Sequence, residues 1–308
     1  MSYLIRRILQ SLVVVFGVSI VAFAMLFMTG DPTEIILGEG ADHMTVDQIE
    51  EFRVKMGFDR PWYIQYASFL GNAVHGDFGY SFTRHQPAFQ VIIEKMPATI
   101  QLAAVAFVLS LLISIPLGVL SAVNPHKPVD RISTVVALLG QSIPSFWLSI
   151  LLMLLFGVQL KWLPISGSGT WQHMVMPAIA LAAFPIARNM RLTRSSMLDF
   201  MQKDFVRTAR AKGISEYRVV TAHVLRNSLL PIVTAIGLEA GFLLGGSVII
   251  ETIFGWPGVG REIVQAIGSK DFNVVQAGVI TLALIFAVVN LVIDLAYSWI
   301  DPRIGFGS

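Results

Sequence analysis

Residues 204–231 read DFVRTARAKGISEYRVVTAHVLRNSLLP, a basic and polar segment set between strongly apolar parts of the chain. Gly213 divides the segment, because glycine adopts at little cost the left-handed conformation that ends a helix. Ser215 is a suitable N-cap for a second helix, with Glu216 well placed in its first turn. The segment therefore predicts two short helices joined by a sharp turn, a shape that can dock into a groove of a partner protein.

On the second of these helices, Tyr217, Val220 and Val224 would form one apolar stripe. The alternative interpretation of the whole segment is a solvated basic loop that obeys the charge rules of membrane topology.

The composition is that of an integral membrane protein. Of 308 residues, 55% are hydrophobic and 14% are charged, with a mean hydropathy of +0.69, far more apolar than a soluble chain of this length needs for its core. The absence of cysteine excludes disulfides, thiolate chemistry and cysteine metal sites. No aromatic stacking platform accompanies the basic segment, so we expect no nucleic-acid partner.

Six apolar runs are expected to cross the bilayer, which places both termini in the cytoplasm. They are Leu9–Met28, Thr99–Val123, Ile132–Gln159, Met174–Met190, Leu229–Ile250 and Val274–Ile300. A cleaved signal peptide is the competing interpretation of the first run, because Ala22-Phe23-Ala24 resembles a signal-peptidase site. The length of that run, about 20 residues, favours an uncleaved span. The third run is interrupted at Ser142-Ile143-Pro144-Ser145.

Between the first two spans, Gly30–Ala98 is too polar to lie in lipid. Thr45 and Gln48 are spaced as a capping box, which predicts a helix that ends at Gly57. Pro61 opens a second helix, and Pro87–Met96 predicts a short amphipathic one. We therefore expect an all-α membrane protein with a small helical external subdomain, organised as residues 1–98 and a five-helix core at 99–308.

Four residues of the fifth span are candidates for the substrate path or for helix packing. Gly237, Gly241 and Gly245 recur every four residues, which allows another helix to approach closely, in this chain or in a second subunit. Glu239 lies near the middle of the span, where an ionisable group needs water or a polar partner. A substrate-path role and a structural hydrogen bond are both consistent with that position.

The segment from Glu251 to Gly260 reads ETIFGWPGVG, in which Trp-Pro-Gly forces a tight turn before a short surface helix at Arg261–Ile267. An element of this kind on the external face could gate or receive a substrate, or be an ordinary connecting loop. The residues of this candidate external gate are Glu251, Phe254, Trp256, Pro257 and Gly258.

Two chemistry-bearing motifs are missing from the sequence. It contains neither the G-x-x-x-x-G-K-[ST] loop that cradles phosphates nor the H-E-x-x-H pair that binds zinc. We therefore expect no catalytic residues, no metal site and no ATP hydrolysis by this chain itself.

Several motifs together resemble the dipeptide/oligopeptide/nickel permease family of ABC importers. They are RTARAKG at 207–213, HVLRNSLLP at 223–231, HGDFGYS at 75–81, FGWPGVGR at 254–261 and NLVIDLAYSWIDPRI at 290–304. The resemblance runs essentially end to end and implies the type I ABC importer permease fold. It also implies that the loop at about 188–228 carries a coupling helix that contacts an ATPase subunit. The implied contact residues are Arg207, Thr208, Ala209, Arg210, Ala211, Lys212, Gly213, Ile214 and Ser215.

The broader importer motif consists of Glu-Ala-Ala, then three further residues, then glycine. In this chain Arg207-Thr208-Ala209 stands in place of Glu-Ala-Ala, and Gly213 is the glycine. This departure leaves open which side chains touch the ATPase.

The resemblance further implies a multi-pass protein of the bacterial cytoplasmic (inner) membrane that imports short peptides by alternating access, with glutathione among the candidate substrates. Its implied partners are a second homologous permease subunit, two ATPase subunits that bind ATP and Mg, and an external substrate-binding protein. Import of a nickel chelate by the same fold stays open. So do an ion-coupled carrier that uses Glu239 as its relay and a membrane receptor that carries no solute.

Overall fold

The computed structural model describes residues 2–28, 33, 37, 44–81 and 83–300. These residues form helices almost throughout, and they divide into two compact units. The first unit comprises Met1–Thr99 and Pro257–Leu291, and the second comprises Ile100–Trp256 and Val292–Ser308. The functional division expected at 98/99 stays a prediction, and the first unit also contains a segment from late in the chain.

The first unit combines the N-terminal part of the chain, up to the start of α5, with two helices from its C-terminal part, α12 and α13. Its elements are α1 (Ser2–Met28), α3 (Val46–Met56), α4 (Trp62–Val74), the antiparallel pair β1 (Tyr80–Ser81) and β2 (Gln86–Pro87), α12 (Val259–Gly268) and α13 (Phe272–Ile300) as far as Leu291. The capping box of Thr45 and Gln48 is confirmed, and Gly57 ends α3 with φ +74°. Buried side chains such as Ile92, Ile263 and Val274 form its core.

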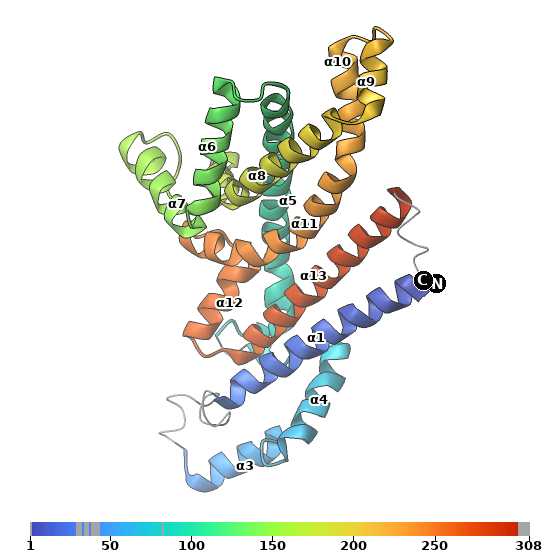
Figure 1. Cartoon of the computed structure of the whole chain (residues 1–308). Helices are drawn as coiled ribbons and strands as arrows, with labels where there is room; N and C mark the ends of the chain where they lie inside the picture. The colour runs from blue at the N-terminus through green and yellow to red at the C-terminus, as the bar shows by residue number, and fades with distance from the viewer. Residues whose placement is uncertain (1, 29–32, 34–36, 38–43, 82, 301–308) are drawn as a thin grey trace. The chain divides into compact units, whose positions relative to one another are not determined.

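The second unit contains the remaining helices, with α8 packed along α11 and α6 (Figure 1). Its elements are most of α5 (Ala88–Val123), α6 (Pro128–Ser142), α7 (Ser145–Leu152), the π-helix η2 (Met153–Gln159), α8 (Trp171–Met201), α9 (Asp204–Ala211), α10 (Glu216–Arg218), the π-helix η3 (Val219–Leu225) and α11 (Arg226–Phe254).

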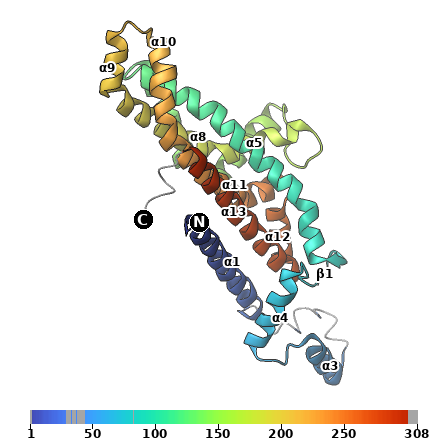
Figure 2. The ribbon, with the colours of Figure 1, turned by 90° about the vertical axis from the view of Figure 1, so that its right-hand side faces the viewer.

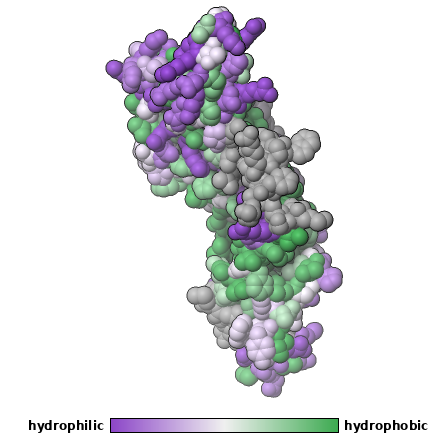
Figure 3. Space-filling model, turned by 45° about the vertical axis from the view of Figure 1, so that its right-hand side comes forward, coloured by the Kyte–Doolittle hydropathy of each residue, from purple (hydrophilic) through white to green (hydrophobic). Residues whose placement is uncertain are grey.

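Among the residues that the structure describes, three helices are long and apolar enough to cross a membrane, over Ile5–Met25, Ala88–Val123 and Phe272–Ile293. Counting each bent helix pair as one span raises the number to as many as six. The predicted interruption at Ser142–Ser145 is confirmed, since α6 and the helical segment Ser145–Gln159 meet at 107°. Large apolar side chains such as Val13 and Leu112 are about 70% exposed, which suits a lipid-facing surface. Figure 3 shows such hydrophobic surface next to a strongly hydrophilic region.

Two helix boundaries differ from the prediction. The separate helix expected at Pro87–Met96 is wrong, because α5 runs without interruption from Ala88 to Val123. Pro97 falls inside this helix, so a proline was not sufficient to end it. The fourth span was predicted to end at Met190, but α8 continues to Met201, since Arg191–Ser196 contains no helix-breaking residue. The predicted cytoplasmic tail after Ile300 lies outside the described residues.

Candidate functional site

The basic segment folds as the predicted pair of short helices. Gly213 has φ +74°, a conformation that favours glycine, and it separates α9 from α10, which Ser215 precedes as N-cap residue. No cap hydrogen bond from the Ser215 side chain is formed, so only its position is as predicted. We call residues 204–225 the elbow (Figure 2).

The elbow is held together by an apolar core of its own. Val206 and Ala209 of α9 pack with Val219 and Val224 of η3 and with Met197 of α8, all buried. The basic side chains Arg207, Arg210, Lys212 and Arg218 remain on the exposed surface. The elbow is therefore a folded unit that packs on α8 and presents its cations to solvent.

The apolar stripe predicted for the second helix is partly wrong. Val220 and Val224 are buried, but Tyr217 is 81% exposed and Val219 is buried. The prediction assumed an α-helical period, whereas residues 219–225 are wound as a π-helix, which shifts side chains around the axis. Tyr217 is thus free to contact another protein.

Arg210 closes the elbow across its turn. The Nε and Nη2 atoms of Arg210 donate to the two carboxylate oxygens of Glu216, at 3.0 and 2.5 Å. Hydrogen bonds from Arg210 lower the pKa of the Glu216 carboxyl from its ordinary value. Both side chains remain about half exposed, so the pair shapes the elbow while leaving Arg210 within reach of a partner.

Glu239 is buried on α11, with 1% of its surface exposed. Its Oε2 accepts a hydrogen bond of 2.5 Å from Nδ2 of Asn189, and Nη1 of Arg188 lies 3.7 Å from its Oε1. In the sequence, Arg188 falls where the predicted fourth span (Met174–Met190) and the loop at about 188–228 overlap, and no partner was predicted for it, so its pairing with Glu239 was missed. Nothing in the sequence around Arg188 and Asn189 indicates that their partner is Glu239, because that depends on α11 being the helix packed against α8.

The three glycines of α11 differ in environment. Gly237 and Gly241 are buried, whereas Gly245 is exposed and no atom lies within 4 Å of where its Cβ would be. Their roles in packing or in a substrate path stay predictions.

In the second unit, α11 ends with Gly255 at φ +64°, and the Trp256 N–H donates to the Glu251 carbonyl at 2.9 Å. Glu251, Phe254 and Trp256 are buried. In the first unit, Pro257 and Gly258 lead into α12, which is the predicted short helix with wider bounds. Its buried residues include Val259, Glu262 and Ile263, so it is not confined to the surface. The gate role of these residues stays a prediction.

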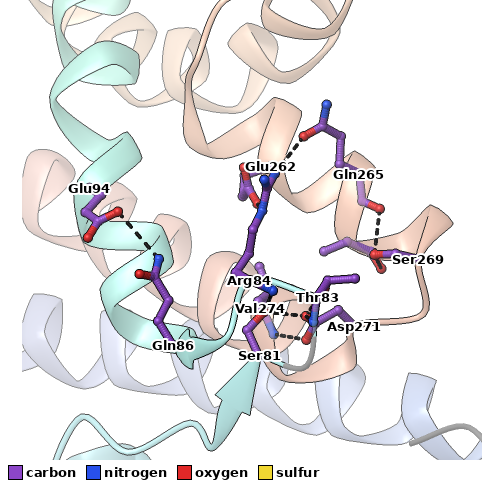
Figure 4. Close-up of polar contacts among 11 residues, drawn as sticks. Ser81, Thr83, Arg84, Gln86, Glu94, Glu262, Gln265, Ser269, Asp271 and Val274 are labelled. Atoms are coloured by element: carbon purple, nitrogen blue, oxygen red, sulfur yellow. Dashed lines mark hydrogen bonds and ion pairs between the residues drawn. The ribbon is translucent and has the colours of Figure 1, made fainter. Parts of the chain in front are cut away.

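The first unit contains a polar cluster that the sequence did not reveal (Figure 4). Arg84 donates from Nε and Nη2 to the carboxylate of Glu262, at 2.7 and 3.0 Å, and also reaches Gln265. The hydroxyls of Ser81 and Thr83 donate to Asp271 at the start of α13. These partners are 178 to 190 residues apart, so no local spacing could predict them. The cluster fastens the loop between β1 and β2 to α12 and α13.

Within the described residues, no three His, Asp or Glu side chains are grouped in a way that could hold a metal ion.

A bundle of straight and bent membrane helices with a folded basic elbow defines a membrane component of a transport system. The chain belongs to the family of binding-protein-dependent transport system inner membrane components, whose model matches residues 114–306. The model for the N-terminal part of such membrane components matches residues 1–103. The chain is thus a multi-pass inner-membrane permease subunit of an ABC importer.

Curated relatives cover the whole chain. The glutathione transport system permease protein GsiC of Escherichia coli strain K12 is 38% identical over 307 residues, 99% of each chain. The protein of the same name from Shigella dysenteriae serotype 1 shows the same identity and coverage. A solved amino acid ABC transporter crystallised with histidines matches with a TM-score of 0.54 and 18% identity, over 70% of this chain and 94% of that one. This last likeness supports the fold.

Proposed function

We propose that this permease subunit carries short peptides, glutathione included, into the cell by alternating access. The observation that carries the proposal is the 38% identity, over 99% of both chains, to permeases named for glutathione transport. Peptides share the amide backbone and the terminal charges of glutathione, so one path can serve both.

The complex in which it acts contains a second related permease subunit, two ATPase subunits that bind ATP and Mg, and an external substrate-binding protein. Both termini of the chain lie in the cytoplasm, on the same side as the elbow. The exposed basic surface of the elbow and the exposed Tyr217 support a protein partner on that side, since Tyr and Arg are enriched in the centres of interfaces.

Nucleotide binding changes the permease only if the ATPase pair contacts its two states with different affinity. The elbow supplies a contact of this kind, because its apolar core packs on Met197 near the end of α8 and η3 continues directly into α11. Movement of the elbow therefore displaces the two helices that bury Glu239.

Uptake by the reconstituted complex tests this function. We expect ATP-dependent accumulation of a labelled dipeptide or of glutathione in proteoliposomes that contain all subunits and the binding protein. Arg210→Glu places a carboxylate beside Glu216 and reverses the exposed charge, so we expect uptake to fall at least about a hundredfold while insertion and assembly persist.

Two further variants sharpen the test. The exchange Arg210→Glu with Glu216→Arg restores the pair and the net charge of the elbow but not the cation at position 210, so it stays inactive if Arg210 itself contacts the ATPase. Arg131→Gln, at an exposed arginine of α6, should transport normally. Wild-type uptake by Arg210→Glu would refute the coupling role of the elbow. Accumulation driven by an ion gradient without ATP would instead indicate a secondary carrier, and a nickel chelate belongs in the substrate panel.

A further inference from the structure

Arg188 and Glu239 form a loose ion pair within the part of α8 and α11 expected to lie in the membrane. Glu239 is 1% exposed and its carboxylate accepts a hydrogen bond from Asn189, whereas 45% of the Arg188 side chain is exposed. The 3.7 Å separation is too long for a hydrogen bond, so no N–H of the guanidinium is committed to Glu239. The Arg188 side chain makes no hydrogen bond to any other residue that the structure describes, so five directed donors remain available there.

Arg188 stands at one end of a polar row on α8. The exposed residues of this stretch recur every three or four positions and thus share one face. They are Phe184, Arg188, Arg191, Ser195 and Asp199. A charged row of this kind is costly against lipid and is tolerated where it faces water or protein. Arg191, Ser195 and Asp199 belong to the predicted cytoplasmic loop, so this face of α8 leads from water to Arg188 at the inner end of the predicted span.

An aromatic pair adjoins the cation. Phe184 lies one turn before Arg188 on α8, and Phe242 lies one turn after Glu239 on α11. Their ring centroids are 6.1 Å apart, and both rings are partly exposed. The face thus combines apolar surface with a guanidinium one turn away, and both features come from the same two helices.

We propose that Arg188 binds the carboxylate of a peptide in transit, with an apolar part of the peptide against Phe184 and Phe242. This inference rests on the proposed function and names the recognising group. A guanidinium and a carboxylate match in a planar, two-bonded geometry that an ammonium does not offer. The buried Glu239 is a positioning residue, since it orients the guanidinium and offsets its charge while the site is empty.

Glu239 also makes the interaction with cargo weak enough for transport. The Glu239 carboxyl oxygen 3.7 Å from Arg188 competes with the arriving carboxylate for the guanidinium, so the cargo binds and then leaves. A site on a path needs this balance, because tight binding would stop release.

The absence of cysteine from this chain permits a test by charge replacement. Arg188→Cys is assembled with cysteine-free partner subunits in proteoliposomes, and uptake of a labelled dipeptide with a free carboxylate is measured. We expect uptake at least about tenfold below that of the wild type, because a charge-assisted pair is lost. Reaction with aminoethyl methanethiosulfonate, which restores a cation, should bring uptake to within about threefold of the wild type, whereas the sulfonatoethyl reagent, which adds an anion, should not. Arg131→Cys is the matched control, and neither reagent should alter its uptake.

A second readout does not depend on transport. The free-carboxylate dipeptide should slow labelling of Cys at position 188 at least about fivefold, and the same peptide as its C-terminal amide should protect little. Failure of the thiol to react with either aqueous reagent, or equal protection by acid and amide, would overturn the proposal. So would an uptake defect that the cationic reagent does not restore. A wild-type complex that carries no peptide would instead refute the proposed function, while specific protection by the carboxylate would still support the site.

Discussion

Two arginines of α8, six residues apart, form ion pairs of opposite kind. Arg194 donates from Nε and Nη2 to both oxygens of Asp130, at 2.6 and 3.0 Å. Asp130 also accepts from the Ser121 hydroxyl and from the His126 backbone N–H, at 2.5 and 2.8 Å. Every acceptor position of this buried carboxylate is used, so the cluster fastens α5, α6 and α8 to one another.

In the pair of Arg188 and Glu239, the guanidinium makes no hydrogen bond to the carboxylate. A single guanidinium nitrogen stands 3.7 Å from the carboxylate, which receives one hydrogen bond, from Asn189. An arginine and a carboxylate thus meet in two ways on one helix: the pair with Asp130 uses the guanidinium donors, whereas the pair with Glu239 leaves them unused. The number of hydrogen bonds each carboxylate accepts distinguishes the two.

The largest effect is expected for Asp130→Ala. Four donors lose their acceptor, although Arg194 is 28% exposed and can turn toward water, so we expect a loss of about 3 kcal/mol in the free energy of unfolding. Thermal or denaturant unfolding of the purified permease measures it. Asp199→Ala, at an exposed position of α8, is the control, and an equally small change in both variants would show that the closed pair does not stabilise the bundle.

The second largest effect is expected for Gly118→Ala, at the close contact between α5 and α8 next to this cluster. A Cβ on Gly118 would lie 2.6 Å from Cβ of Thr193 and 2.8 Å from the Met190 carbonyl oxygen. Because backbone must move to admit a methyl group, Gly118→Ala should cost about 2 kcal/mol of stability. Gly245→Ala meets no atom within 4 Å and should be neutral or slightly stabilising. Reversal of this order would argue against the helix packing described for the second unit.

The smallest effect is expected for Glu239→Gln. The new amide oxygen can still accept from Asn189, and the loose contact with Arg188 contributes little, so the change in unfolding free energy should stay below about 1 kcal/mol. The same unfolding assay decides it. A loss as large as that of Asp130→Ala would mean that Arg188 and Glu239 form a closed structural pair, and would remove the basis for a ligand role of Arg188.

Local features of the fold were predictable because they depend on neighbouring residues alone. The capping box of Thr45 and Gln48, the left-handed turn at Gly213 and the break at Ser142–Ser145 are all present. Helix ends without such a signal were predicted wrongly. A helix was expected to end just before Pro97 and another at Met190, but α5 and α8 continue through these positions. The exposure of Tyr217 was predicted wrongly because the winding of residues 219–225 departs from the α-helical period.

The membrane class, the family and the basic elbow followed from the sequence, because apolar run lengths, charge placement and motifs are properties of consecutive residues. The partners of Arg84, Arg188 and Arg194 were decided only by tertiary structure. Each pairs with a carboxylate 51 to 178 residues away, from Arg188 with Glu239 to Arg84 with Glu262. An ion pair forms only where helix packing brings two side chains within about 4 Å, and no spacing along the chain encodes that distance.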